Sequence, residues 1–214
     1  MADARLVFRR EVSSQRVLVR IAREDGGRFV FTPGQHLTVT FANGVRLPYS
    51  IASAPGLAYV ELYVSLIEPW PEQGSLLELS EPAGTFTLDG VPDNARLLFI
   101  ASGSGVAPFV SMLRTYLPRR AHSALIQGSR SAEELAFSEE LEAMDGLIYR
   151  PTLTQAADTW PGLRGRVQPW LAEALREFSD AHVFLCGHAP MIEEGRGLAV
   201  AQGFDVARIH AEFY

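Results

Sequence analysis

Cysteine is almost absent from this sequence, which has a single one, Cys186, among 214 residues. An internal disulfide, a zinc site built from several cysteines and an iron–sulfur cluster held by several thiolates are therefore excluded within this chain. If the protein moves electrons, an organic cofactor must carry them.

Long apolar runs and an excess of positive charge are also missing. No run approaches the roughly 20 apolar residues of a membrane-spanning helix, and residues 1–12 lack the apolar centre of a signal peptide. The net charge of −6 argues against nucleic acid as the main partner. We therefore expect a soluble, cytoplasmic protein with neither nucleic-acid nor membrane partners, and the sequence indicates no metal site.

From Ala4 to about Leu88, the chain consists of short apolar segments separated by turns that contain glycine and proline. The segments cover residues 6–8, 16–21, 28–31, 36–41, 59–66 and 75–79. Short alternating runs at close spacing are typical of antiparallel sheets, so we expect a sandwich or barrel of about six strands.

From residue 94 on, strand-like and helix-like patterns alternate. Apolar runs at 97–101, 123–127, 147–153, 182–186 and 206–213 are interleaved with helical patterns near 106–117, 131–145, 166–177 and 189–202. Ser131 and Glu134 have the spacing of a capping box, which places the start of the second helix. The alternation predicts a doubly wound parallel sheet. We expect two domains, residues 1–93 and 94–214.

Residues 97–117 contain a buried-type strand, a glycine-bearing turn and a helix. At Gly103, Ser104 and Gly105 the backbone can bend sharply and come close to a ligand. The free N–H groups and positive dipole end of the helix favour a phosphate there, and Pro108 is tolerated in the first helical turn. Alone this turn is weak evidence, because the three-glycine dinucleotide fingerprint is absent.

Seven short motifs occur in the order seen in one known family. They are residues 33–35 (PGQ), 46–53 (RLPYSIAS), 82–86 (PAGTF), 102–108 (SGSGVAP), 128–130 (GSR), 185–187 (LCG) and 212–214 (EFY). Together they resemble the ferredoxin–NADP(H) reductase superfamily over essentially the whole chain. The resemblance implies an N-terminal antiparallel β-barrel that binds FAD, a C-terminal α/β domain that binds NAD(P)H, and hydride transfer between nicotinamide and flavin N5.

The resemblance assigns flavin-binding roles within the barrel. It implies that Tyr49 packs on the isoalloxazine and that the Ser50 hydroxyl hydrogen-bonds near flavin N5 and orients it for hydride transfer. Tyr63, Val64 and Ser65 match a strand that carries further flavin contacts, although this segment is also an adequate ordinary strand.

Two departures from the family pattern concern the FAD pyrophosphate. The family usually has an arginine two residues before the tyrosine, where this chain has Leu47, with Arg46 one residue earlier. A one-residue slip sends a side chain to the other face of a strand, so Arg46 can substitute only if the strand is locally bulged. The family's Gly-x-x-Ser/Thr segment is also absent, and residues 67–73 stand in its place. FAD is then held by fewer contacts, binds loosely as a substrate, or is replaced by FMN.

In the second domain, the resemblance places the adenosine end of the nicotinamide cofactor at Ser129 and Arg130. A guanidinium there can bind a 2′-phosphate through two hydrogen bonds, which favours NADPH over NADH; the alternative for Arg130 is a helix-flanking surface charge, a common arrangement. Thr154 ends the next strand at the edge where open parallel sheets bind ligands. Cys186 matches the family cysteine beside nicotinamide C4, and Gly187 lets the cofactor approach closely.

The last residues complete the implied site. In relatives that end this way, the final tyrosine stacks over the flavin where nicotinamide must later lie, which makes Tyr214 the candidate gate. Glu212 resembles the family glutamate that assists proton movement or orients nicotinamide. A carboxylate in a poorly solvated pocket could have a raised pKa and relay a proton.

Three functions are consistent with these features. The first is a flavin-dependent oxidoreductase that transfers hydride from NAD(P)H to bound FAD and passes electrons to ferredoxin, flavodoxin or another redox partner. The second is an NAD(P)H:free flavin reductase, which the missing pyrophosphate segment favours. The third is a non-catalytic module that has lost flavin, and the joint presence of Tyr49, Ser50, Cys186, Glu212 and Tyr214 argues against it. We expect a monomer.

Overall fold

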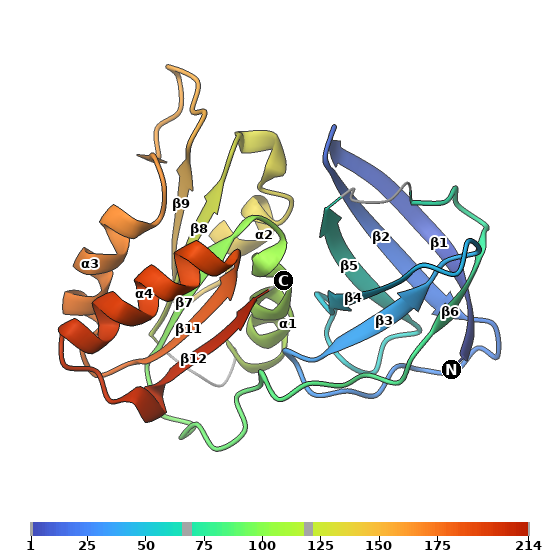
Figure 1. Ribbon diagram of the computed structural model, residues 1–214, viewed down its shortest axis with the longest axis horizontal. Coiled ribbons are helices and arrows are strands. Elements are labelled where there is room, and N and C mark those ends of the chain that lie inside the picture. Colours follow the sequence, from blue (N-terminus) through green and yellow to red (C-terminus); the bar gives the residue numbers. More distant parts are fainter. Residues whose placement is uncertain (1, 66–69, 118–121, 214) are drawn as a thin grey trace. The chain divides into compact units, whose positions relative to one another are not determined.

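The computed structural model describes residues 2–65, 70–117 and 122–213 (Figure 1). The chain divides into two compact units, Met1–Leu88 with Ala107–Thr115, and Asp89–Val106 with Tyr116–Tyr214. The helix α1 (Ala107–Tyr116) therefore packs mainly with the N-terminal strands, although it follows the first strand of the second sheet in the chain. The sequence-based domain bounds, 1–93 and 94–214, stay a prediction.

The first unit contains an antiparallel six-stranded sheet in the order β4-β3-β6-β1-β2-β5. Its strands are β1 (Ala2–Ser13), β2 (Arg16–Arg23), β3 (His36–Thr40), β4 (Arg46–Ser50), β5 (Tyr59–Ser65) and β6 (Leu76–Leu79). A bridge between Ile51 and Leu62, with a 2.8 Å hydrogen bond from the Ala52 N–H to the Glu61 carbonyl oxygen, joins the end of β4 to β5. Since β4 and β5 are the two edge strands, the sheet closes into a barrel.

Alternation along the strands builds the core of this barrel. In β2, Val17, Val19 and Ile21 are fully buried and point to the interior, whereas Arg16 and Arg20 lie on the other face. The interior cluster draws apolar side chains from all six strands of the sheet and from the loops at Phe29 and Trp70. The antiparallel sheet predicted from the sequence is therefore confirmed.

The strand expected at residues 28–31 is not formed. Phe29 is buried in the barrel core and exchanges backbone hydrogen bonds with the loop at Gly56 and Leu57, at 2.8 and 3.0 Å. Its neighbour Val30 is 84% exposed. The apolar run thus places Phe29 in the core and Phe31 against it, but it forms no ladder of strand hydrogen bonds, so its composition alone was misleading.

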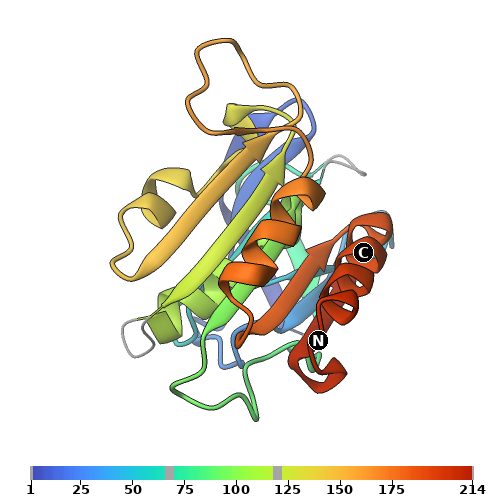
Figure 2. The same ribbon diagram turned by 90° about the vertical axis from the view of Figure 1, so that its left-hand side faces the viewer.

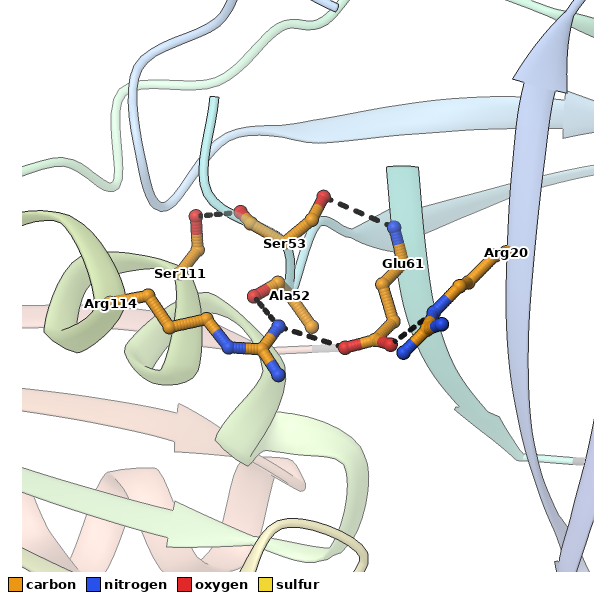
Figure 3. A network of polar contacts seen from close by, with 6 residues as sticks. All are labelled: Arg20, Ala52, Ser53, Glu61, Ser111 and Arg114. Atoms are coloured by element: carbon orange, nitrogen blue, oxygen red, sulfur yellow. Dashed lines mark hydrogen bonds and ion pairs between the residues drawn. The ribbon is translucent and has the colours of Figure 1, made fainter. Parts of the chain in front are cut away.

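A buried carboxylate ties α1 to the barrel within this unit (Figure 3). Glu61 on β5 is 2% exposed and accepts hydrogen bonds from Arg20 on β2 and Arg114 on α1, both at 2.8 Å. The Arg114 guanidinium also donates to the Ala52 carbonyl oxygen at 2.9 Å. One turn earlier, the Ser111 hydroxyl donates to the Ser53 carbonyl oxygen at 2.7 Å. These bonds fix the segment that directly follows β4.

The second unit contains a parallel six-stranded sheet in the order β10-β9-β8-β7-β11-β12. Its strands are β7 (Leu97–Ser102), β8 (Ser123–Ser129), β9 (Leu147–Leu153), β10 (Leu163–Arg164), β11 (His182–Gly187) and β12 (Ile209–Phe213). Its helices are η1 (Gly103–Val106), η3 (Ala132–Glu134), α2 (Ser138–Glu142), α3 (Gln168–Glu177), α4 (Ala189–Ala201) and η4 (Val206–Arg208). This is the doubly wound arrangement expected from the sequence. Within the described ranges, no helix is long and apolar enough to cross a membrane.

Helices α3 and α4 lie side by side on one face of this sheet (Figure 2). Leu171 and Leu175 of α3 and Met191 of α4 pack against Leu98 and Leu185 of the strands. Each strand contributes side chains to both faces, which explains the nearly continuous apolar runs in its sequence.

Residues 131–145 do not form the single helix that their pattern predicted. The chain forms η3, then a turn, then the short α2. Leu135 and Phe137 are both buried, and residues two apart cannot both face the core from one straight helix. The expected capping box is also not formed, because Ser131 makes no side-chain cap hydrogen bond. The carboxylate of Glu134 instead binds Arg130.

Two histidines face each other across β11 and β12. The Nδ1 atom of His182 lies 3.3 Å from Nε2 of His210, and the His210 ring stacks on Phe184 with centroids 4.2 Å apart. Burial, and secondarily the nearby His182, lower the pKa of His210 below its ordinary value of 6.5. The folded state therefore binds a proton at His210 less readily than the unfolded chain does.

This difference predicts that acid weakens the fold through His210. As the pH falls below about 6.5, the unfolded chain takes up this proton before the folded protein does, so stability is lost on going down in pH and retained above that value. His210→Phe keeps the stacked ring and removes the proton site. Between pH 7 and 5 the unfolding free energy of the wild type should fall more than that of the variant. The difference should stay below roughly 1.4 kcal/mol per pH unit, the limit for one proton. Urea unfolding at a series of pH values measures the difference, and parallel curves would contradict the assignment.

Candidate functional site

The parallel sheet changes winding direction beside β7. From β7 the chain adds β8, β9 and β10 on one side, then returns to add β11 and β12 on the other. In open α/β sheets such a switch point leaves a crevice at the carboxyl ends of the strands, and ligands bind there. The carboxyl ends of β7 and β11 carry the turn at Gly103–Val106 and the pair Cys186 and Gly187. The turn at Gly103–Val106 and the pair Cys186 and Gly187 thus lie at the switch point, where the topology predicts a ligand site.

The turn after β7 packs tightly on the end of β11. Gly103 has a φ of 56°, which glycine adopts without strain. A side chain at Gly105 would overlap the carbonyl group of Cys186, and one at Gly187 would overlap the Ser102 hydroxyl. The chain itself therefore fills the space beside Gly105 and Gly187, a packing reason for these glycines that the sequence did not reveal.

Ser102 and His188 join the same two strand ends. The Ser102 hydroxyl lies 2.8 Å from Nδ1 of His188 and accepts the His188 backbone N–H at 3.2 Å. His188 is exposed and directly precedes α4. No role for either residue could be predicted from the sequence, since only the β7–β11 pairing brings them together.

Cys186 and Glu212 are register partners on β11 and β12. In a parallel pair such partners lie on the same face of the sheet, so their side chains are neighbours. Cys186 is fully buried, whereas Glu212 is partly exposed. The register thus brings together two residues to which the resemblance gives roles at the nicotinamide, and those roles stay predictions. Tyr214 lies outside the described residues.

The ends of β8 and β9 meet at the same edge of the sheet. The Thr154 backbone N–H donates to the Ser129 carbonyl oxygen at 3.1 Å, which places these residues side by side. The Ser129 hydroxyl oxygen is buried and has no hydrogen-bond partner among the described residues. The Arg130 guanidinium is bound by Glu134, with 2.5 Å between Nη2 and Oε1. The three residues predicted to hold the adenosine end therefore lie together at this edge, beside Glu134, whose spacing predicted a helix cap.

On the barrel, the β3–β4 ladder runs in one regular register from His36–Ser50 to Thr40–Arg46. No bulge shifts Arg46, which is exposed and shares a face with Ser50. Leu47 and Tyr49 lie on the opposite face and pack against the barrel core. The condition under which Arg46 could replace the usual arginine beside Tyr49 is therefore not met.

Tyr49 lies next to Trp70, with ring centroids 5.3 Å apart. Trp70 also contacts Phe41, with ring centroids 5.1 Å apart, and is buried, so it anchors its loop to the barrel. Its indole N–H is buried and lacks a hydrogen-bond partner among the described residues. Of residues 67–73, which stand where the family has its phosphate-binding segment, residues 67–69 lie outside the described ranges.

The three strand residues expected to contact flavin differ in their surroundings. Val64 points into the barrel core, while Tyr63 is buried on the other face. Arg16 on β2 is the register partner of Ser65 and donates a hydrogen bond to its hydroxyl. The Arg16 guanidinium also lies over the Tyr63 ring, 6.0 Å from its centroid. The structure thus adds a cation beside the strand end that precedes the missing Gly-x-x-Ser/Thr segment.

Pro108 and Ser104 complete the placement of the predicted residues. Pro108 is buried in the first turn of α1, where the sequence placed it. Ser104 lies in η1, partly exposed at the switch point.

Comparisons with known proteins match this architecture. A family model described as an oxidoreductase NAD-binding domain matches residues 99–196. A ferredoxin–NADP reductase B from Sorangium cellulosum is 36% identical over 238 residues, which cover 99% of this chain and 97% of the relative. A glycine betaine monooxygenase reductase subunit from Pseudomonas aeruginosa is 25% identical over 209 residues, and there the match covers 87% of this chain and 57% of the relative.

A solved structure has the same fold. The crystal structure of a ferredoxin NADP+ reductase from Neisseria gonorrhoeae, with bound FAD and NADP, superposes with a TM-score of 0.86 at 22% identity. The match covers 99% of this chain and 97% of that one. At this identity the likeness establishes the fold.

The closed barrel, the doubly wound sheet and its switch point define an oxidoreductase with a nicotinamide-dinucleotide-binding domain. The chain belongs to the ferredoxin–NADP reductase family, as its motifs predicted. FAD and NAD(P)H are the cofactors of this superfamily, in agreement with the sequence-based prediction.

Proposed function

We propose that this protein transfers hydride from NAD(P)H to bound FAD and passes the electrons to a ferredoxin- or flavodoxin-type redox partner. The observation that carries the proposal is the switch-point pairing of Cys186 with Glu212 beside the Gly103–Val106 turn. A non-catalytic protein that kept only this fold would not need a carboxylate next to the buried thiol of Cys186. In the bound state, NAD(P)H supplies hydride at C4 and FAD accepts it at N5.

The residues of the second unit fit a nicotinamide dinucleotide. The turn at Gly103–Val106 suits the pyrophosphate, while Ser129, Arg130 and Thr154 suit the adenosine end. The buried Ser129 hydroxyl, which lacks a partner among the described residues, supports a polar ligand group nearby. Cys186 would pack beside the nicotinamide, and Glu212 would hold a proton or orient the ring.

The residues of the first unit fit a flavin. Tyr49 offers an aromatic face and Ser50 a hydroxyl at the end of β4, and the Ile51–Leu62 bridge sets them beside Tyr63 and Val64. The buried Trp70 indole N–H, next to Tyr49, supports a polar ligand group at this end of the barrel. Arg16 and Ser65 supply a cation and a hydroxyl for a phosphate, in place of the arginine that Leu47 replaces. Tyr214 remains the proposed gate over the flavin.

An absorption spectrum tests this function. Protein purified by gel filtration should carry a flavin spectrum that bleaches on anaerobic addition of NADH or NADPH. Reduced protein should then reduce a ferredoxin or a flavodoxin. A protein that binds no flavin and oxidises neither dinucleotide would contradict the proposal.

A second candidate, a free-flavin reductase, is favoured by one observation. The regular β3–β4 ladder leaves the apolar Leu47 on the face of Tyr49, where a cation would bind the FAD pyrophosphate. Under this alternative the purified protein is colourless and oxidises NAD(P)H only when FAD or FMN is added. The dissociation constant for FAD would then equal that for riboflavin within about threefold, since the pyrophosphate contributes nothing.

A further inference from the structure

Glu134 is a buried carboxylate that the predicted reaction does not use. It ends η3, four residues after Arg130, and is 4% exposed. Buried carboxylates require partners, because desolvation of a lone charge is costly. Glu134 therefore has a structural or functional reason to lie at this edge of the sheet.

Glu134 binds Arg130, the cation expected to bind the cofactor. The Glu134 carboxylate accepts Nη2 of Arg130 at 2.5 Å and the Arg130 backbone N–H at 3.3 Å. The side chain of Arg130 is 41% exposed, so part of the guanidinium still faces solvent. A ligand at the end of β8 would meet an arginine whose charge is already balanced.

This charge balance acts differently on the two nicotinamide dinucleotides. NADPH carries a 2′-phosphate and NADH a neutral 2′-hydroxyl at the same position. A phosphate close enough to bind Arg130 also feels the adjacent carboxylate, and Coulomb repulsion at such distances offsets much of the attraction. A hydroxyl carries no net charge, so Glu134 affects it little.

We propose that Glu134 sets the nicotinamide preference of this protein by neutralising Arg130, so that NADH is accepted as readily as NADPH. The inference rests on the proposed function, because it places the adenosine end of the dinucleotide at the end of β8. It also revises the preference for NADPH that the Arg130 position suggested in the sequence. Glu134 acts through Arg130 and is a positioning residue.

Binding of the adenosine fragments to the flavin-loaded protein tests the proposal without turnover. Adenosine 2′,5′-bisphosphate and 5′-AMP differ only in the 2′-phosphate, and calorimetry at fixed ionic strength gives both dissociation constants. The wild type should bind the two within about threefold of each other, because the balanced pair gives the phosphate little advantage. Glu134→Gln should bind the bisphosphate about tenfold more tightly, because no carboxylate then offsets the charge-assisted hydrogen bond from Arg130 to the phosphate. The dissociation constant for 5′-AMP should not change.

Glu133 provides the matched control. It is the adjacent residue and is exposed, so Glu133→Gln removes the same formal charge from a solvated position. This variant should change neither constant by more than about twofold, because water and salt screen an exposed charge. The double variant Arg130→Gln/Glu134→Gln should lose the gain, since the effect of Glu134 passes through Arg130.

Four outcomes would overturn the inference. The first is a wild-type protein that already binds the bisphosphate at least tenfold more tightly than 5′-AMP. That result would overturn the inference even if Glu134→Gln does not fold. The second is weaker binding of the bisphosphate to Glu134→Gln, which would make Glu134 a support for phosphate binding. The third is an equal gain in Glu133→Gln. The fourth is no binding of either fragment although NADH or NADPH bleaches the flavin, which would move the subsite and leave the proposed function intact. Only a failure to bleach counts against that function.

Discussion

Replacing Ser50 by alanine is expected to slow the reduction of bound flavin by about a hundredfold, the usual effect of losing one positioned hydrogen-bond donor at a reacting centre. Ser50 is buried at the carboxyl end of β4, and its strand is held in a regular ladder with β3. The backbone will therefore not shift to compensate for the lost hydroxyl. Anaerobic stopped-flow absorbance with NADPH and with NADH measures the rate.

Ser53 is the control for this substitution. It is also buried, three residues further along, and its hydroxyl accepts the Glu61 backbone N–H at 3.1 Å. Ser53→Ala should lower the melting temperature and leave the reduction rate within a few-fold of the wild type, because it touches no proposed ligand atom. Equal slowing in both variants, or less than a threefold change in Ser50→Ala, would remove Ser50 from the reaction.

The largest loss of stability is expected for Glu61→Ala. The substitution leaves the guanidinium groups of Arg20 and Arg114 without their shared carboxylate (Figure 3). Removing one partner of a buried ion pair costs about 3 to 5 kcal/mol. The exposed fraction of Arg20, 39%, puts the expected loss near the lower end of this range, about 3 kcal/mol, because solvent partly screens that arginine.

The ion pair of Arg5 with Glu24 is the control for Glu61. It lies in the same unit with a comparable 2.9 Å contact, but its side chains are 44% and 39% exposed. Glu24→Ala should cost far less than Glu61→Ala, because water and salt screen an exposed pair. Urea denaturation of both variants decides between the two cases. A cost for Glu61→Ala no greater than that for Glu24→Ala would show that burial adds nothing to this network.

Most strands and helices of the second unit could be predicted from the sequence. Parallel strands such as β7 and β11 bury both faces, so their residues form apolar runs that no other element explains. The prediction failed at 131–145, where the burial of both Leu135 and Phe137 requires a turn that periodicity does not encode. It also failed at 28–31, where Phe29 enters the core and Phe31 packs against it, but no strand forms.

The candidate site could be predicted only where motifs carried it. Tyr49, Ser50 and Cys186 stand in recognisable local sequences, and their roles remain predictions. Arg16 and Glu134 had no such signal. The pairing of Arg16 with Ser65 depends on strand register, and Glu134 has the spacing of a helix cap. Tertiary packing decides contacts between distant segments such as Arg16 and Ser65. It also decides whether the Glu134 carboxylate caps a helix or binds Arg130.

The position of α1 bears on how proteins of this architecture can exchange parts. Ser111 and Arg114 satisfy groups of the barrel, yet they follow β7 in the chain. A fragment ending at residue 93 would therefore leave Glu61 with one of its two arginines. A chimera of two relatives would keep the contacts between α1 and the barrel only when both come from the same parent. The chain thus crosses between the two units three times, after residues 88, 106 and 115, and a swap at a single point separates parts of one unit.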